Sequence, residues 1–135
     1  MKLILFLLLC WNVAGATNLL PVVNVSRLIA AIAAVETGND DQAIGAAGER
    51  TRYQISRAVW EKYSDVPFVR AHQYPGDARK VARAYVAEIQ KRTGRRTSVY
   101  HIALAWNAGP NRHVYTRHSH DYARRVMNIY EEGTK

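Results

Sequence analysis

Residues 24–38 read NVSRLIAAIAAVETG, and this stretch decides the fold that the sequence predicts. The tripeptide Asn24-Val25-Ser26 offers polar side chains that cap the start of a helix. Apolar side chains then recur at helical spacing, at Leu28, Ile29, Ile32, Ala33 and Val35. Because the glycine and polar residues at 38–40 are typical of a helix end, we expect this helix to stop near Glu36.

The rest of the chain also has the pattern of helices separated by turns. Residues 44–54 are rich in glycine and polar residues, which predicts a loop or a small hairpin. Turns are expected at Pro67 and at residues 74–76. The sequence therefore predicts an all-α domain, α+β at most. The further expected helices are a short one within 55–63, a long one capped by Asp77 and ending at Gly94, one capped by Thr97 or Ser98 and ending at Gly109-Pro110, and a last one from Ser119 or His120 onward.

Length and composition limit the classes of protein. A chain of 135 residues with 48% hydrophobic residues is typical of one globular domain. A single cysteine, Cys10, cannot form an intramolecular disulfide or a zinc cluster. Lysine and arginine number 19 against 11 acidic residues, a net charge of +8 that points to an anionic partner.

The first residues change how this charge is interpreted. Residues 1–16, MKLILFLLLCWNVAGA, have the pattern of a signal peptide cleaved near Ala16. The apolar run is too short to span a bilayer, which takes about 20 residues. A buried N-terminal segment and acylation at Cys10 are the alternatives. We therefore expect residues 17–135 to form a single exported domain, periplasmic or extracellular, with no membrane anchor and a net charge of +7.

Glu36 is the first candidate for chemistry. It ends an otherwise apolar helix, where a carboxyl group near the core loses its hydration. Desolvation raises the pKa of a carboxyl group, and a general acid at neutral pH needs a raised pKa. The alternative is a carboxylate that points to solvent from a frayed helix end.

The second candidate is the segment 105–110, AWNAGP. An amide followed by small residues and a helix-ending Gly-Pro is expected to leave Asn107 exposed in a groove. Its side chain both donates and accepts hydrogen bonds, as a sugar or an acetamido group requires. The alternative is a helix cap in which Asn107 binds its own backbone.

Four segments in order resemble the soluble lytic transglycosylase (SLT) family, peptidoglycan-cleaving enzymes related to goose-type lysozyme. They are Glu36 at a helix end, Gln54-Ile55 18 residues later, the segment WNAGP at 106–110 and the segment YARRV at 122–126. The family has a glutamate at a helix end, the same spacing to a Gln-Ile pair, an Ala-Tyr-Asn-Ala-Gly-Pro segment and a terminal Tyr-Val-x-x-Val. The resemblance covers about residues 26–131.

The resemblance implies a compact lysozyme-like helical domain with a substrate cleft. By it, Glu36 is the general acid/base, and Gln54 and Asn107 contact the glycan or its acetamido group. Tyr122, also expected among the substrate-binding residues, would reach back toward the carboxylate of Glu36. Trp106 stands where the family usually has tyrosine and either stacks on a sugar ring or packs in the core.

The resemblance also implies a mechanism with one carboxylate. The glutamate protonates the glycosidic oxygen between MurNAc and GlcNAc, the N-acetyl group assists, and the sugar's own C6 hydroxyl closes a 1,6-anhydro product. No cofactor and no metal are implied. A lysozyme-like hydrolase needs a second carboxylate. None of the nearby acids, at Asp40, Asp41, Glu49 and Glu61, matches a motif position.

The chain departs from the family pattern between residues 45 and 53. Gly45 stands where the family has serine, and the tripeptide 51–53, Thr-Arg-Tyr, replaces Gly-Leu-Met. We still expect Tyr53 to be among the substrate-binding residues. Arg50 or Arg52 either meets the carboxylates of the peptide stems or belongs to a solvated loop.

The remaining signals weigh less. His113, His118 and His120 cluster in sequence, yet no carboxylate or cysteine set accompanies them, so no metal site is expected. The expected partner of a monomer is the peptidoglycan strand, with envelope proteins that set its location, and not nucleic acid. Three other classes stay open: a non-catalytic glycan-binding module, a membrane-active basic protein and a nucleic-acid binder.

Overall fold

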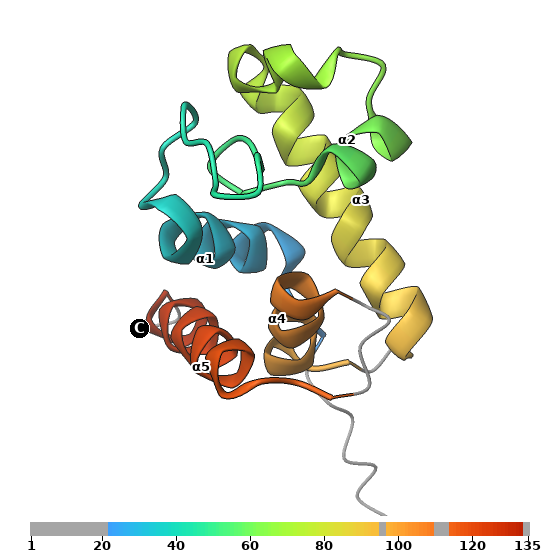
Figure 1. The fold of residues 1–135 in the computed structure, drawn as a ribbon. Helices are drawn as coiled ribbons and strands as arrows, with labels where there is room; N and C mark the ends of the chain where they lie inside the picture. The colour runs from blue at the N-terminus through green and yellow to red at the C-terminus, as the bar shows by residue number, and fades with distance from the viewer. Residues whose placement is uncertain (1–21, 95–96, 110–113, 134–135) are drawn as a thin grey trace, which may run out of the picture.

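The structure is a computed structural model that describes residues 22–94, 97–109 and 114–133. The expected signal peptide at 1–16 lies outside the described residues, as do Pro110 and His113. The described chain is mostly helical, so the predicted all-α class is confirmed. Its elements are α1 (Val25–Thr37), α2 (Arg57–Tyr63), the 3₁₀ helix η1 (Phe68–Gln73), α3 (Pro75–Thr93), α4 (Val99–Ala108) and α5 (Arg117–Glu132) (Figure 1).

Helix α1 forms as the sequence predicts. The side chain of Asn24 accepts a hydrogen bond from the backbone N–H of Arg27 at 3.0 Å, which caps the first turn. At the other end Gly38 adopts a left-handed conformation with φ of 65°, and its N–H bonds the carbonyl of Ala34 at 3.1 Å. The helix therefore ends just after Glu36, which fixes the place of this carboxyl group in the fold.

Three later boundaries differ from the prediction, each for a local reason. Helix α3 begins at Pro75 rather than after Asp77, because proline has the right φ for a first helical residue and needs no N–H partner there. Helix α5 begins at Arg117, because Thr116 caps it instead of Ser119 or His120. The 3₁₀ helix η1 fills the interval in which only turns were expected.

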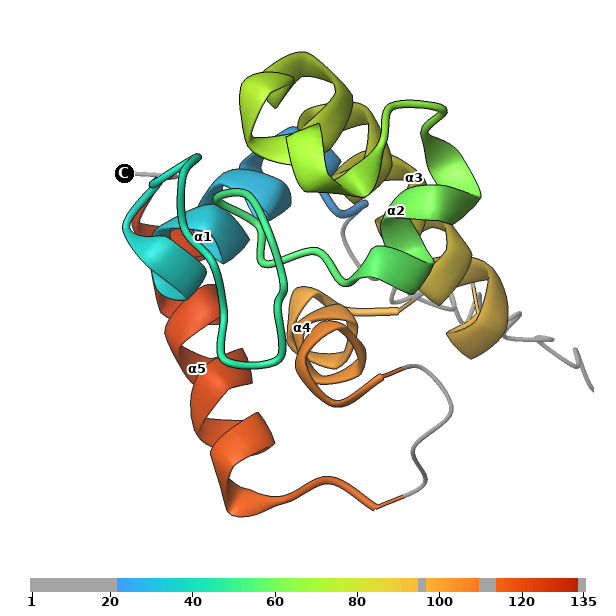
Figure 2. The ribbon, with the colours of Figure 1, turned by 45° about the horizontal axis from the view of Figure 1, so that its top comes forward.

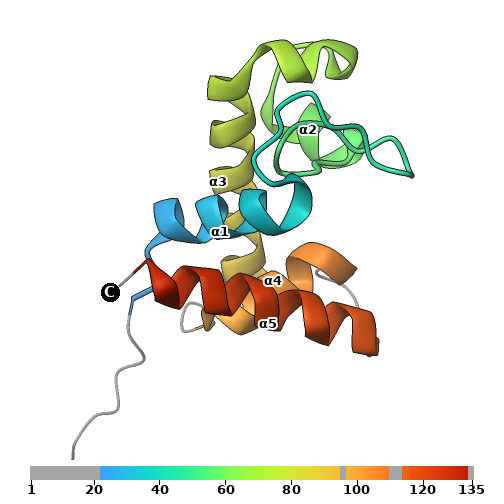
Figure 3. The same ribbon diagram turned by 90° about the vertical axis from the view of Figure 1, so that its left-hand side faces the viewer.

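Helix α1 packs against both α5 and α3. In Figures 1 and 3 it runs alongside α5, while α3 crosses close to α1. Helix α4 packs mainly on α5 and also meets α3. The side chains that fill the space between these helices include Leu28, Ile32, Trp60, Val86, Ile89, Ile102 and Val126, all fully buried. This packing fixes the end of α1 relative to α4 and α5.

A long loop connects α1 to α2 and runs beside α1 and α4 (Figure 2). Two antiparallel bridges, Ile44 with Arg50 and Arg50 with Ile55, are its β structure among the described residues, so the expected hairpin is reduced to single contacts. The hydroxyl of Thr37 donates to the carbonyl of Arg52 at 3.1 Å and ties the loop to the end of α1. The loop therefore stands over the carboxyl group of Glu36.

No described helix is both long enough and apolar enough to cross a membrane.

Candidate active site

Glu36 sits in the last turn of α1 and is half-buried. The hydroxyl of Tyr122, from α5, donates a hydrogen bond to Oε1 of Glu36 at 2.8 Å. The two residues are 86 positions apart in the sequence, so the contact depends on the packing of α5 against α1. The resemblance predicted that Tyr122 would reach toward Glu36, and the structure contains this hydrogen bond.

Tyr122 holds the carboxyl group from the protein side. It is 2% exposed, so it supports Glu36 from behind, and the expectation that it binds substrate directly has no support in this geometry. Burial, followed by the charge of Glu36, holds the pKa of the Tyr122 hydroxyl well above its ordinary value. The hydroxyl therefore stays protonated at physiological pH and acts on Glu36 only as a donor.

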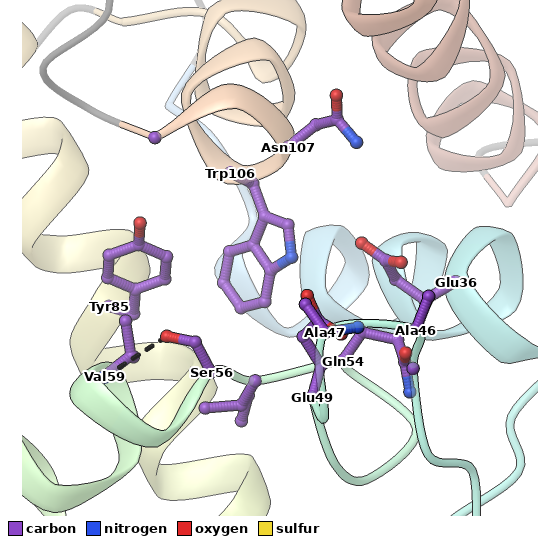
Figure 4. A pocket seen from close by; sticks show the side chains of 13 residues that line it. Glu36, Ala46, Ala47, Glu49, Gln54, Ser56, Val59, Tyr85, Trp106 and Asn107 are labelled. Carbon is purple, nitrogen blue, oxygen red and sulfur yellow. Dashed lines mark hydrogen bonds between the residues drawn. The ribbon is translucent and has the colours of Figure 1, made fainter.

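A cleft of about 460 Å³ opens in front of Glu36 (Figure 4). Its walls come from the end of α1, the long loop, the start of α2, the middle of α3 and the end of α4. The lining residues are Glu36, Gly45, Ala46, Ala47, Glu49, Gln54, Ile55, Ser56, Val59, Tyr85, Trp106, Asn107 and Gly109. Three of the predicted site residues, Gln54, Trp106 and Asn107, thus share one cleft with Glu36.

Burial dominates the electrostatics of Glu36. Desolvation raises the pKa of its carboxyl group above the ordinary value, and the negative charge of Glu49 raises it further. Hydrogen bonds from the Tyr122 hydroxyl and from the indole of Trp106 lower it, as does the positive charge of Arg125. The net pKa remains raised, which keeps more of the carboxyl group protonated near neutral pH.

Glu49 and Gln54 meet in the cleft above Gly45. A Cβ atom on residue 45 would collide with Oε1 of Gln54 and with Oε2 of Glu49, so a larger residue there would require these two side chains to move. The backbone N–H of Ala47 donates to Oε2 of Glu49 at 3.0 Å, and Nε2 of Gln54 donates to the carbonyl of Thr51 at 3.2 Å. The Glu49 carboxylate therefore takes up space next to the position at which the family has a serine side chain.

Two aromatic rings form the far part of the cleft. Tyr85 of α3 and Trp106 of α4 lie with ring centroids 5.1 Å apart, tilted by 56°. Trp106 is 8% exposed and belongs to the core, as one of the two expectations had it, and it also lines the cleft. Burial, and next the charge of Glu88, raises the pKa of the Tyr85 hydroxyl.

Asn107 points its amide toward the cleft from the last turn of α4 (Figure 4). The helix end itself is closed by the backbone, where the N–H of Gly109 bonds the carbonyl of Ala105 at 2.9 Å. The amide of Asn107 is thus placed to donate to and accept from a bound ligand.

The expectation that Tyr53 binds substrate is wrong. Its side chain is 4% exposed and belongs to the hydrophobic core, and it does not line the cleft. Its two neighbours in the loop, Arg52 and Gln54, are only half-buried.

The arginines of the same segment are engaged within the protein. Arg52 makes a two-pronged ion pair with Asp41, with N–O distances of 2.7 and 2.6 Å. The guanidinium of Arg50 lies 5.6 Å from the ring centroid of Phe68. Neither arginine lines the cleft, so the expected contact with stem carboxylates has no support in this geometry. The alternative of a fully solvated loop does not hold either, because both side chains contact other residues.

Sequence reasoning missed the contribution of Tyr85 and Val59 to the cleft. Both lie on helices that the sequence predicts, and neither was singled out as a site residue. The polar tip of Tyr85 within an apolar stripe is the signal that could have marked it. Glu49 was considered only as a second acid without a motif, and its place in the cleft follows from the path of the loop.

Within the described residues, no group of three or more histidine, cysteine or carboxylate side chains is arranged to hold a metal ion. His120 instead shares a hydrogen bond of 2.6 Å with the hydroxyl of Tyr100.

Comparison of the chain with protein-family models, with curated proteins and with solved structures found no match. The site is therefore interpreted from its own geometry and from the sequence motifs.

Proposed function

We propose that the protein is an exported peptidoglycan lytic transglycosylase with a lysozyme-like fold, in which Glu36 is the single general acid/base. One observation carries the proposal: a desolvated carboxyl group at a helix end, held by the Tyr122 hydroxyl at 2.8 Å, faces an open cleft. The order and spacing of Glu36, Gln54, Asn107 and Tyr122 support the same assignment.

The proposed reaction needs one proton carrier. Protonated Glu36 gives its proton to the glycosidic oxygen between MurNAc and GlcNAc as the C–O bond breaks, and the substrate's N-acetyl oxygen stabilises the anomeric carbon. The Glu36 carboxylate then takes the proton of the C6 hydroxyl, whose oxygen closes the 1,6-anhydro ring. The proton returns to Glu36, and no water is consumed.

The cleft residues have corresponding roles in this proposal. The amides of Gln54 and Asn107 are placed to bind the hydroxyl and acetamido groups of the sugars. The ring edge of Trp106 and the ring of Tyr85 supply an apolar surface on which a sugar packs. Tyr122 is a positioning residue, because it acts on the substrate only through Glu36.

The test is a digest of purified peptidoglycan with the wild-type protein and with Glu36→Gln, analysed by mass spectrometry. We expect fragments with 1,6-anhydro ends from the wild type and a loss of at least about 100-fold in rate for the variant. Normal strand binding by both proteins with no fragments from either would instead identify a glycan-binding module.

A hydrolase is the second candidate, and Glu49 is the observation that favours it. Its carboxylate lines the same cleft as Glu36, and inverting glycosidases use a second carboxylate as the base that activates water. The same digest separates the two reactions, since a hydrolase leaves reducing ends. Glu49→Gln would abolish hydrolysis but leave the formation of anhydro ends largely intact.

A further inference from the structure

A second hollow lies one helical turn along α2 and α3 from the cleft. It has a volume of about 540 Å³ and is lined by Lys62, Tyr63, Ala84, Ala87, Glu88, Lys91 and Arg92. Val59 of α2 and Tyr85 of α3 line the cleft, and each lies three residues before a member of this basic hollow. Residues three apart on a helix are neighbours on its surface, so the two sites adjoin.

The basic hollow is positively charged. It holds three cations, from Lys62, Lys91 and Arg92, against the single carboxylate of Glu88, which gives a net charge of +2. The charges of Glu88 and Arg92 also act on the pKa of the Tyr85 hydroxyl, which lines the cleft. A polymer that leaves the cleft past Tyr85 would therefore enter a positive field.

One carboxylate organises this cluster. Glu88 receives the ammonium group of Lys62 at 2.7 Å, the guanidinium of Arg92 at 2.6 Å and the hydroxyl of Tyr63. These partners lower the pKa of Glu88 to about 2, so it stays ionised in weak acid. It thereby holds Lys62 and Arg92 in place at one side of the basic hollow, while Lys91 extends from the next position on α3.

We propose that the basic hollow binds the carboxylates of the peptides carried by the glycan strand that occupies the neighbouring cleft. This inference rests on the proposed function, because it takes the ligand of the cleft to be peptidoglycan. It also assigns the stem contact to α2 and α3 in place of Arg50 and Arg52, which are bound within the protein.

The experiment compares two substrates and two matched variants of the purified protein. The substrates are peptide-bearing glycan strands and the same strands after an amidase has removed the peptides. The site variant is Lys62→Gln with Lys91→Gln, which leaves Glu88 paired with Arg92. The control variant is Lys80→Gln with Arg117→Gln, which removes the same charge from exposed side chains outside the basic hollow.

We expect the site variant to raise KM about three- to ten-fold on peptide-bearing strands, with kcat unchanged and with no effect on peptide-free strands. The control variant should alter both substrates equally and by less. Lys91→Gln alone leaves Lys62, Tyr63 and Arg92 paired with Glu88, so it should give a smaller change in the same direction even if the double variant is unstable.

Binding measured in the Glu36→Gln background separates this inference from the proposed function. Peptide-dependent binding that needs Lys62 and Lys91 supports the inference even if the wild type cleaves nothing. Equal losses on both substrates, no difference from the control, or Lys-dependent binding only to a polyglycerol phosphate would each overturn it. A fall in melting temperature without a change in KM would assign the cations to the stability of the helix ends alone.

Discussion

At the scale of single residues, opposing effects set the pKa of the Glu36 carboxyl group. Burial raises its pKa, whereas the hydrogen bonds from Tyr122 and Trp106 lower it. A general acid that must also act as a base needs both, because it has to hold its proton near neutral pH and still release it. Tyr122 is the residue through which this balance can be tested.

We predict that Tyr122→Phe lowers kcat about 10- to 100-fold and shifts the alkaline limb of the pH–activity profile to higher pH. The hydroxyl donates to Oε1 of Glu36 and so favours its ionised form; without it, the pKa of Glu36 rises further. The measurement is kcat/KM against pH on peptidoglycan strands, since its limbs report the ionisation of the free enzyme.

Tyr130→Phe is the matched control. Its hydroxyl lies on the same helix and accepts a hydrogen bond from the backbone N–H of Asn24 at 3.0 Å, with Glu36 uninvolved. It should lower the melting temperature slightly and leave the alkaline limb in place. If the alkaline limb of the pH–activity profile did not shift in Tyr122→Phe either, the hydroxyl would serve only the packing of α5.

At the scale of elements, the loop between α1 and α2 carries unusual backbone angles. Thr51 has φ of 70° and Gln54 has φ of 50°, both in the left-handed region that favours glycine. Thr51 is β-branched and 1% exposed, and it stands where the family that the sequence resembles has glycine. The backbone shape at this position is thus one that glycine adopts readily, and threonine meets it at a cost in strain.

We predict that Thr51→Gly is more stable than Thr51→Ala by about 0.5–1 kcal/mol. Both variants lose the buried hydroxyl and methyl groups, but only alanine keeps the strain of a Cβ atom at positive φ. Urea unfolding of the two variants measures the difference. Ala30→Gly, on the exposed face of α1, should show the opposite order and cost about 1 kcal/mol. The same order at both positions would mean that Thr51 is not strained.

The helices and the loop also show which parts of the fold could be predicted from the sequence. The cap at Asn24 and the glycine at 38 are local signals, and they fixed α1 to within a residue. The six-residue helix η1 has no apolar period long enough to detect, and only Phe68 and Ala71 are buried in it. Tyr53 is buried in a loop whose conformation includes the bridges of Arg50 with Ile44 and Ile55. No local sequence pattern predicts these bridges.

At the scale of the whole molecule, the site exists only because distant segments converge. Glu36 and Gln54 could be linked by their spacing, but the position of the Glu49 carboxylate beside Gly45 depends on the conformation of the loop that carries both residues. The basic hollow likewise brings residues of α2 next to the end of α3. The sequence alone did not distinguish this arrangement from cations that are separately solvated. Motif spacing thus predicted the candidate site residues, and the packing of the helices and the loop determined which of them lie together in the cleft.

Placing an ionisable carboxyl group at this convergence costs the molecule stability, and we predict that Glu36→Gln is more stable than the wild type at pH 7 by about 2–5 °C in melting temperature. The raised pKa of Glu36 means that the unfolded chain releases this proton at lower pH than the folded one. Wild-type stability therefore falls as pH rises from the ordinary pKa through the folded pKa, whereas glutamine has no proton to lose.

Thermal unfolding of both proteins between pH 4 and pH 8 tests this sign. The two melting temperatures should converge at pH 4, where Glu36 is protonated in both states, and separate above it. A variant that is less stable than the wild type at pH 7 would show that the hydrogen bonds from Tyr122 and Trp106 outweigh burial. The Glu36 carboxyl group would then be ionised at neutral pH and unable to act as the acid.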